Sequence, residues 1–151
     1  AWMGGDETAL GNQEDIWSLS NLERGKRVWE IFDANLPWLF PDISGFYSGK
    51  AVLIRSIDLT SRSYQSKEAV TEKIMEYARG LSSYRGQEQP WGKERIVIRE
   101  KDITSRELLL VIPKNPIDPQ IKQAVFECAE LCAAIGVTLR VEEYGVKKGV
   151  N

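Results

Sequence analysis

Two strands separated by a well-marked helix constrain the fold of this 151-residue chain more than any other feature. Residues 107–112 form an almost continuous apolar strand, and a second strand is expected at 137–141. Between them, Asp118-Pro119 supplies the cap residue and the first-turn proline that begin a helix, and Gly136 ends it. A strand, a helix and a strand within this short span predict a right-handed βαβ crossover, and therefore parallel strands.

A hairpin is expected upstream of this crossover. Residues 40–47 and 50–58 read as two strands, and Ser48-Gly49 between them suits a two-residue turn. Both faces of the second strand are apolar until Arg55. This pattern predicts a central strand whose C-terminal end opens into polar surroundings.

The other expected elements complete an α/β order. A capping box at Ser20 and Glu23 predicts a helix that runs to about Asn35. In chain order there follow a helix at 67–79 ended by Gly80, a loop at 82–94 and a short strand at 95–99. Once one helix and the short strand are treated as insertions, an αβββαβ core with a mixed sheet remains. This order resembles the core of restriction-endonuclease-like (PD-(D/E)XK) nucleases, although other α/β domains share it.

Composition excludes several kinds of chemistry. The chain has no histidine, so catalytic triads, histidine proton relays and most zinc sites are excluded. Cys128 and Cys132 are four residues apart on one expected helix, which suits two reduced structural thiols better than a disulfide. The net charge is −2, but residues 50–106 carry 12 basic and 8 acidic side chains. That positive middle segment allows a surface that faces phosphate, and it also suits an ordinary solvated face.

The length fits one domain. Residues 1–15 are glycine-rich and acidic, which predicts a flexible leader, and residues 146–151 predict a loose tail. The domain itself is expected over 16–145. No apolar run approaches the roughly 18 residues of a membrane-spanning helix, so no membrane segment is expected in this domain.

Short motifs between residues 16 and 143 resemble the C-terminal toxin domains of contact-dependent growth inhibition (CdiA) proteins. Each motif is weak alone, and their order and spacing carry the resemblance. They are Trp17-Ser18-Leu19, Arg24-Gly25, Asn35-Leu36-Pro37, Phe40-Pro41, Ser48-Gly49, Arg55-Ser56-Ile57-Asp58-Leu59, Ser63-Tyr64-Gln65 and the later Leu110-Val111-Ile112-Pro113.

The resemblance implies a nuclease-like fold and a role in bacterial competition. Such domains are delivered from the surface of the producing cell into the cytoplasm of a neighbour. There they cut tRNA or DNA, with tRNA the expected substrate here. A cognate immunity protein neutralises them, and some act on tRNA only together with elongation factor Tu. Mg²⁺ or another divalent metal held by clustered carboxylates is the cofactor that the resemblance implies.

The catalytic positions of the family do not carry over. By motif spacing, its helix glutamate falls on Trp29, its hairpin aspartate on Ser44 and its strand lysine on Arg55. Tryptophan cannot bind Mg²⁺ and serine is a poor replacement for a carboxylate. Arginine keeps a positive charge and can contact phosphate, but it does not deprotonate.

A displaced site is one interpretation of these departures. The candidate catalytic residues are Arg55, Asp42, Glu30 and Asp58, with Asp42 and Glu30 as candidate metal ligands. Asp42 lies two residues before Ser44, so both are expected on one strand face. Arg55 is expected to contact substrate phosphate, Asp42 or Asp58, or else to hold the hairpin through an ion pair. Further candidate contacts to nucleic acid are Arg62, Lys67, Trp91 and Arg95.

Two hypotheses about function stay open at this point. In the first, the domain is a metal-dependent RNA nuclease toxin. In the second, the nuclease fold is catalytically degenerate, needs no cofactor, and acts as a non-nuclease toxin or a protein-interaction module. Trp29 and Ser44 favour the second, and Arg55 with the basic middle segment favours the first.

Overall fold

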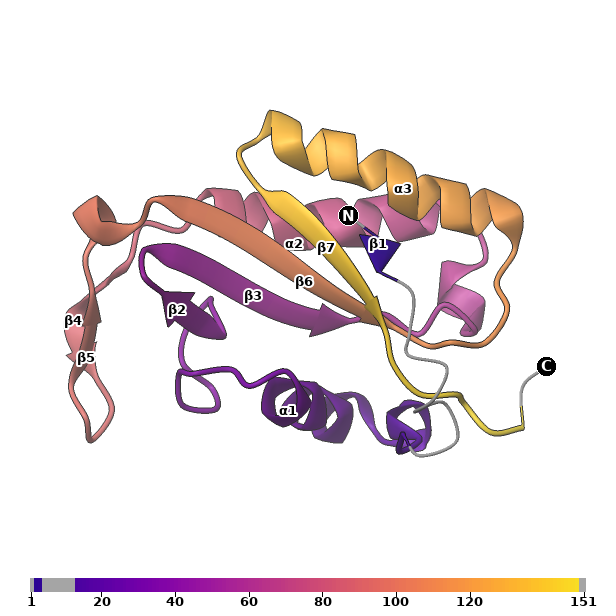
Figure 1. Cartoon of the computed structure of the whole chain (residues 1–151), viewed down its shortest axis with the longest axis horizontal. Helices are drawn as coiled ribbons and strands as arrows, with labels where there is room; N and C mark the ends of the chain where they lie inside the picture. The colour runs from indigo at the N-terminus through magenta and orange to yellow at the C-terminus, as the bar shows by residue number, and fades with distance from the viewer. Residues whose placement is uncertain (1, 4–12, 150–151) are drawn as a thin grey trace.

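A computed structural model describes residues 2–3 and 13–149 of the chain. Its elements are arranged around one five-stranded sheet with helices on both faces (Figure 1). The helices are α1 (Asn21–Ile31), α2 (Lys67–Ser82) and α3 (Pro119–Ala134), with short 3-10 turns η2 (Ile16–Ser18), η3 (Arg62–Tyr64) and η4 (Glu100–Asp102). The strands are β1 (Trp2–Met3), β2 (Gly45–Tyr47), β3 (Lys50–Ser56), β4 (Gln87–Trp91), β5 (Ile96–Ile98), β6 (Ser105–Ile112) and β7 (Thr138–Glu143).

The large sheet has the order β1-β7-β6-β3-β2 and is mixed. β2 pairs antiparallel with β3, whereas β3 with β6, β6 with β7, and β7 with β1 are parallel pairs. The predicted α/β class with a mixed sheet and a βαβ crossover from β6 through α3 to β7 is therefore confirmed. β4 and β5 form a separate two-stranded sheet.

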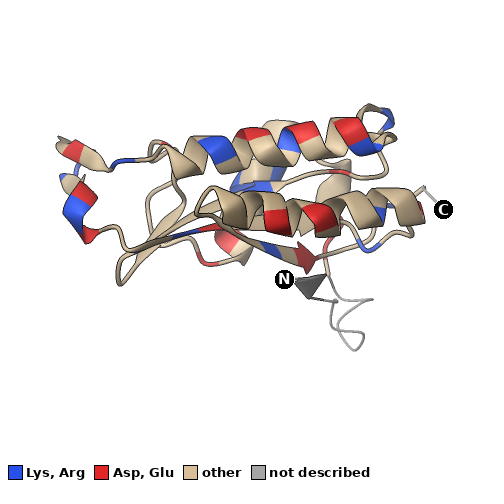
Figure 2. Cartoon of the chain, turned by 90° about the horizontal axis from the view of Figure 1, so that it is seen from above, with Lys and Arg blue, Asp and Glu red and all other residues tan. Residues whose placement is uncertain are grey.

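The central strands are buried on both faces, which explains their near-continuous apolar sequence. In β6, Leu108, Leu110 and Ile112 point into the core beneath α2 and α3, and Leu109 and Val111 point toward α1. α2 and α3 lie side by side on one face of the sheet, and positions with charged residues occur along both helices (Figure 2). The alternation follows from the two-residue period of a strand.

Local signals in the sequence account for the boundaries of several elements. Ser20 and Glu23 form the complete capping box at the start of α1, and the Asp118 carboxylate accepts from the backbone N–H of Gln120 before α3. The turn between β2 and β3 has φ of 49° at Ser48 and 92° at Gly49. A Cβ at Gly49 would lie 2.5 Å from the Thr104 hydroxyl oxygen, so the turn requires glycine there.

Some predicted boundaries were wrong. α2 continues through Gly80 to Ser82, because packing against α3 outweighs the low helix propensity of one glycine. The predicted loop at 82–94 contains β4, whose Gln- and Glu-rich sequence gave no strand signal. The first hairpin strand begins at Gly45 rather than Phe40, because Leu39 and Asp42 have positive φ values that interrupt an extended chain.

The described parts of the two ends of the chain contact each other. Most of the predicted leader, residues 1 and 4–12, and the last part of the tail, residues 150–151, lie outside the described residues. The side-chain carbonyl of Gln13 accepts a hydrogen bond from the backbone N–H of Gly145, and the Asp15 carboxylate accepts one from that of Lys148. Within the described residues, no helix combines the length and apolar character needed to cross a membrane.

The doubly buried sheet predicts a large penalty for opening a cavity in β6. Leu110 is fully buried, so we expect Leu110→Ala to lower the free energy of unfolding by about 2–5 kcal/mol. Leu131 on α3 is 46% exposed and provides a matched control, for which the same substitution should cost less than about 1 kcal/mol. Urea denaturation of both variants measures this, and equal losses would contradict the assignment of the core.

Candidate functional site

The candidate site is a cavity of about 420 Å³ beside the C-terminal end of β3. It lies between the start of α1, the segment that follows α1, and Tyr77 of α2. Its lining combines two arginines, one carboxylate, two polar side chains and an apolar wall. These residues are Asn21, Leu22, Arg24, Gly25, Val28, Trp29, Trp38, Leu39, Phe40, Pro41, Asp42, Ile54, Arg55, Ser56 and Tyr77.

Arg55 brings the first positive charge to this cavity. It is half-buried on β3, its guanidinium donates to the carbonyl of Ile54 at 3.0 Å, and it lies over the Tyr77 ring at 5.7 Å from the centroid. Burial lowers the pKa of the guanidinium, while Tyr77 and Asp42 act to raise that pKa. In the described part of the chain, no carboxylate lies within ion-pair distance of Arg55.

Arg24 on α1 brings the second positive charge. Its Nε donates to the Ser56 hydroxyl at 3.0 Å and its Nη2 donates to the side-chain oxygen of Asn21 at 2.9 Å. The guanidinium also lies 5.2 Å from the centre of the Trp17 ring. Burial lowers the pKa of Arg24, while Asp58 and Tyr77 act to raise that pKa. Among the residues described, Arg24 too has no carboxylate within ion-pair distance.

Two half-buried guanidinium groups beside one cavity have the charge and geometry that suit an anion. Arginine remains charged in proteins, and an arginine away from bulk water requires an anionic partner or substantial hydrogen bonding. Here the hydrogen-bond partners are neutral: a hydroxyl, an amide and a backbone carbonyl. Asp58 acts on Arg24, and Asp42 on Arg55, only from beyond ion-pair distance. The planar guanidinium suits bidentate contacts to phosphate or carboxylate oxygens.

The structure separates Asp42 from Ser44, which were predicted to share a strand face. Asp42 lies in a turn before β2 with a φ of 69°, is exposed, and lines the cavity. Ser44 is fully buried, and its hydroxyl oxygen accepts the backbone N–H of Ile54 at 3.0 Å. The shared-face prediction was wrong because the chain is not extended at Asp42, and Ser44 supports the start of the hairpin.

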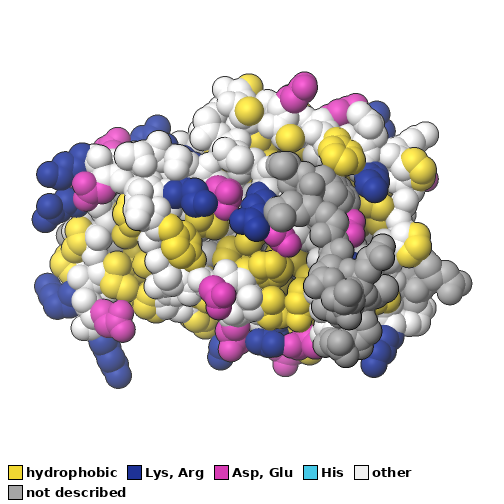
Figure 3. Space-filling model, in the orientation of Figure 1, with side chains coloured by type: hydrophobic (Ala, Val, Ile, Leu, Met, Phe, Trp, Pro, Cys, Tyr) yellow, Lys and Arg dark blue, Asp and Glu magenta, His cyan; other side chains and the backbone are white. Residues whose placement is uncertain are grey.

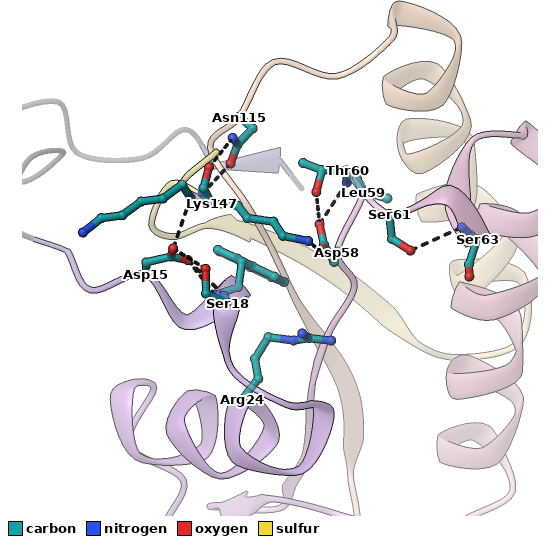
Figure 4. A network of polar contacts seen from close by, with 12 residues as sticks. Asp15, Ser18, Arg24, Asp58, Leu59, Thr60, Ser61, Ser63, Asn115 and Lys147 are labelled. Atoms are coloured by element: carbon teal, nitrogen blue, oxygen red, sulfur yellow. Dashed lines mark hydrogen bonds and ion pairs between the residues drawn. The ribbon is translucent and has the colours of Figure 1, made fainter. Parts of the chain in front are cut away.

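Glu30 and Asp58 do not lie at the cavity. Glu30 is exposed on α1 and pairs with Arg27 at 3.6 Å. Asp58 is buried just after β3, where its carboxylate accepts from the Lys147 ammonium at 2.8 Å and from the backbone N–H and hydroxyl of Thr60. Figure 4 shows how this carboxylate joins the C-terminal segment to the loop after β3. The four candidate catalytic residues thus divide into two at the cavity, Arg55 and Asp42, and two elsewhere.

The described residues do not fit a divalent metal at this site. They contain no group of three or more His, Cys, Asp or Glu side chains placed to hold a metal ion. Trp29, where the resemblance implies a glutamate, is buried and donates its indole N–H to the carbonyl of Leu36. Among the described residues, Asp42 is the one carboxylate that lines the cavity, which it shares with two guanidinium groups. Hard cations such as Mg²⁺ require several oxygen ligands, which this set does not supply.

The four predicted nucleic-acid contacts lie outside the cavity lining and do not gather at one place. Arg62 is exposed in η3, Lys67 is exposed at the start of α2, and Arg95 lies in the turn between β4 and β5. Trp91 is half-buried and packs edge-on against Phe40, with ring centroids 5.2 Å apart. Figure 3 shows basic side chains gathered at the end of the molecule that carries β4 and β5.

Sequence reasoning missed the position of two side chains, Arg24 and Tyr77, in the lining of the cavity. Arg24 belongs to the Arg24-Gly25 motif of the resemblance, but the motif did not indicate that its side chain lines the cavity. Tyr77 lies on α2, and its side chain lines the cavity beside Arg55. Trp38 also lines the cavity and packs at right angles to Trp29, with ring centroids 5.2 Å apart.

Comparison with known proteins identifies the family. Residues 24–142 match the model of the CDI toxin restriction endonuclease-like domain. The chain belongs to this family. This chain is similar in fold to a chain of a solved structure, the CdiA-CT/CdiI toxin and immunity complex from Yersinia pseudotuberculosis, with a TM-score of 0.59 and 17% sequence identity. The match covers 79% of this chain and 96% of that chain. No curated protein matches the chain.

The family confirms the predicted resemblance and the restriction-endonuclease-like fold of this CDI toxin domain. The family also suggests a metal, whereas the described residues of this toxin domain contain no cluster that could hold one. The match at 17% identity concerns the fold alone.

The contacts of Asp58 predict a pH-dependent contribution to the stability of the toxin domain. Burial would raise the pKa of this carboxyl, but hydrogen bonds from Lys147 and Thr60 outweigh burial and lower the pKa below 3.8. A depressed pKa in the folded state stabilises the fold above the unfolded-state value, and that stabilisation disappears as the pH falls through the folded-state pKa.

We therefore expect Asp58→Asn to reduce the free energy of unfolding by about 1–3 kcal/mol at pH 7, with a difference from the wild type that shrinks below about pH 4. Denaturation between pH 2.5 and 7 measures this. Glu130→Gln on exposed α3 is the control and should leave stability within about 0.5 kcal/mol. Normal stability together with loss of toxicity in Asp58→Asn would contradict the structural role and support the catalytic one.

Proposed function

We propose that this CDI toxin domain cleaves RNA, with tRNA as the expected substrate, at the cavity formed by α1, the end of β3 and Tyr77. The observation that carries the proposal is the pair Arg24 and Arg55, two half-buried guanidinium groups that line one cavity without a carboxylate within ion-pair distance in the described residues. The endonuclease-like family supports a phosphodiester as the anion that they bind.

The apolar part of the cavity suits a nucleotide. Trp38 is half-buried beside the arginines, and Leu22 and Leu39 line the cavity while 70% and 66% exposed. Exposed leucines beside a charged cavity favour an apolar contact with the ligand, and a base offers two apolar faces next to a phosphate. If the ligand were a carboxylate side chain of another protein, it would require the two arginines but not the exposed leucines beside them.

Partners and delivery follow from the family. We infer that the domain passes from the surface of the producing cell into the cytoplasm of a neighbour, and that a cognate immunity protein protects the producer. The Yersinia pseudotuberculosis relative was solved as a complex of toxin and immunity protein, which supports this inference. Elongation factor Tu is a further proposed partner, on the resemblance alone.

A second candidate function is a toxin or interaction module without nuclease activity. It is favoured by Trp29 and Ser44, which hold the fold through hydrogen bonds where the resemblance implies carboxylates. This candidate predicts that the cavity binds phosphate but that RNA is not cut. An assay of RNA cleavage therefore distinguishes it from the nuclease function.

The proposal is tested by incubating the purified domain with total RNA, tRNA and double-stranded DNA. We expect Arg55→Ala and Arg24→Ala each to reduce RNA cleavage by about 100- to 1,000-fold, because each removes a preorganised contact to the charge on the phosphate. Arg79→Ala provides a matched control, since Arg79 is exposed near the end of α2 and outside this cavity. When each variant is induced in cells, Arg79→Ala should inhibit growth as the wild type does, and Arg55→Ala and Arg24→Ala should inhibit it much less.

Melting temperatures separate function from folding in this test. Arg55 supports the hairpin only through a bond to its neighbouring carbonyl and a ring contact, so the folded state should persist without it. Full cleavage by a folded Arg55→Ala variant would contradict the proposal. Lost cleavage together with a collapsed melting temperature would show that Arg55 is structural.

Charge should also contribute to inhibition by the immunity protein. We expect acidic side chains of that protein to contact basic residues of the middle segment, with Arg55 at the cavity and Arg62, Lys67 and Arg95 at separate places on the surface. Association rates measured by stopped flow should then fall steeply between 50 and 500 mM NaCl, since screening shortens the reach of exposed charges. A rate that does not change with salt would contradict an electrostatic interface.

A further inference from the structure

We propose that this domain cuts RNA without a metal ion, by attack of the substrate's own ribose 2′-hydroxyl on the adjacent phosphorus, with Asp42, Arg24, Arg55 and Tyr77 in direct contact with the reacting groups. This inference rests on the proposed function, because it assumes RNA as the substrate. It follows from the disagreement between the metal that the family suggests and the side chains present at the cavity.

The carboxylates that a metal would require are engaged elsewhere. Asp58 is held by Lys147 and Thr60, and Glu30 faces Arg27 on the solvent side of α1. In the part of the chain that the structure describes, Asp42 is the single carboxylate at the cavity. One carboxylate beside two guanidinium groups repels a cation more than it attracts one.

The same residues supply by other means what a metal would contribute. A divalent ion neutralises charge on the phosphate during attack, and Arg24 and Arg55 provide two fixed positive charges for that purpose. Their hydrogen bonds to Ser56, Asn21 and the Ile54 carbonyl hold the guanidinium groups in place before substrate arrives. Such preorganised charge costs no rearrangement during the reaction.

The chemical step is balanced by two proton transfers. The Asp42 carboxylate accepts the proton of the 2′-hydroxyl as the bond between the 2′ oxygen and phosphorus forms. The bond between phosphorus and the 5′ oxygen breaks, and the Tyr77 phenol donates its proton to that leaving oxygen. The products are a 2′,3′-cyclic phosphate and a 5′-hydroxyl, and no atom is oxidised or reduced.

Tyr77 suits the role of proton donor. Its side chain lines the cavity beside Arg55, which lies 5.7 Å above its ring. Burial raises the pKa of the phenol more than Lys73 and Arg55 lower it, so the hydroxyl keeps its proton at neutral pH. A protonated phenol can donate to an alkoxide that leaves phosphorus.

The closing experiment uses the whole 151-residue chain and tRNA, after dialysis against EDTA. We expect cleavage to continue within about twofold of the rate with added Mg²⁺ or Zn²⁺, and the products to carry 2′,3′-cyclic phosphate ends. An RNA oligonucleotide with a single 2′-deoxy or 2′-O-methyl nucleotide at the mapped cut should resist cleavage at that position, because it lacks the attacking hydroxyl.

Two variants test the proton transfers. We expect Asp42→Asn and Tyr77→Phe each to reduce cleavage by about 100- to 10,000-fold, with little effect on the binding of uncleavable 2′-O-methyl RNA. Both are near-isosteric, and Asp42 is exposed, so the melting temperature should change little. Glu130→Gln and Arg79→Ala on exposed helix surfaces are the matched controls.

The outcomes distinguish this inference from the proposed function. If the wild-type chain cuts no RNA, the proposed function fails and the inference fails with it. If RNA is cut but EDTA abolishes the activity and Mg²⁺ or Zn²⁺ restores it, or the ends carry 5′-phosphate, or the deoxy-substituted oligonucleotide is cut equally well, the proposed function survives and this inference is overturned.

Discussion

The parallel pairing of β3 with β6 is the constraint on which the rest of the structure depends. Seven residue pairs run from Lys50 opposite Ser105 to Ser56 opposite Val111. Because both faces of these strands are buried, one helix layer must cover each face: α2 with α3 on one side, α1 on the other. A one-residue slip would exchange the residues facing the two layers, so the register also determines which side chains of β3 reach the cavity.

The cavity exists because this pairing ends where the sequence becomes polar. The apolar stretch of β3 stops at Ile54, and the next two residues, Arg55 and Ser56, are half-buried at the edge of α1. Arg24 on α1 reaches across to the Ser56 hydroxyl, so one hydrogen bond joins the helix to the polar end of the strand. The two charges of the site are thus positioned by packing between α1 and β3, and not by a mobile loop.

Patterns that act over a few residues predicted the fold well, and contacts between distant residues account for most of the errors. The Ser20 capping box and the Ser48-Gly49 turn depend on neighbouring residues, and both are present. β4 forms because β5 pairs with it, so its sequence alone carries no signal. At the site, the catalytic candidates Arg55 and Asp42 do line the cavity. Asp58 does not, because its carboxylate binds Lys147, which is 89 residues away along the chain and which no local pattern connects to it.

The positions that depart from the family pattern support one another physically. A carboxylate at position 29 would be buried beside Trp38, at a cavity that Arg24 and Arg55 also line. Trp29 instead donates its indole N–H to the backbone carbonyl of Leu36, and its ring forms part of the apolar wall of the cavity. At the positions where the resemblance implies two carboxylates and a lysine, this chain has Trp29, Ser44 and Arg55, and the described side chains that line the cavity include two arginines and one carboxylate. Such a site attracts a phosphate directly, where one rich in carboxylates would need a cation between itself and the phosphate.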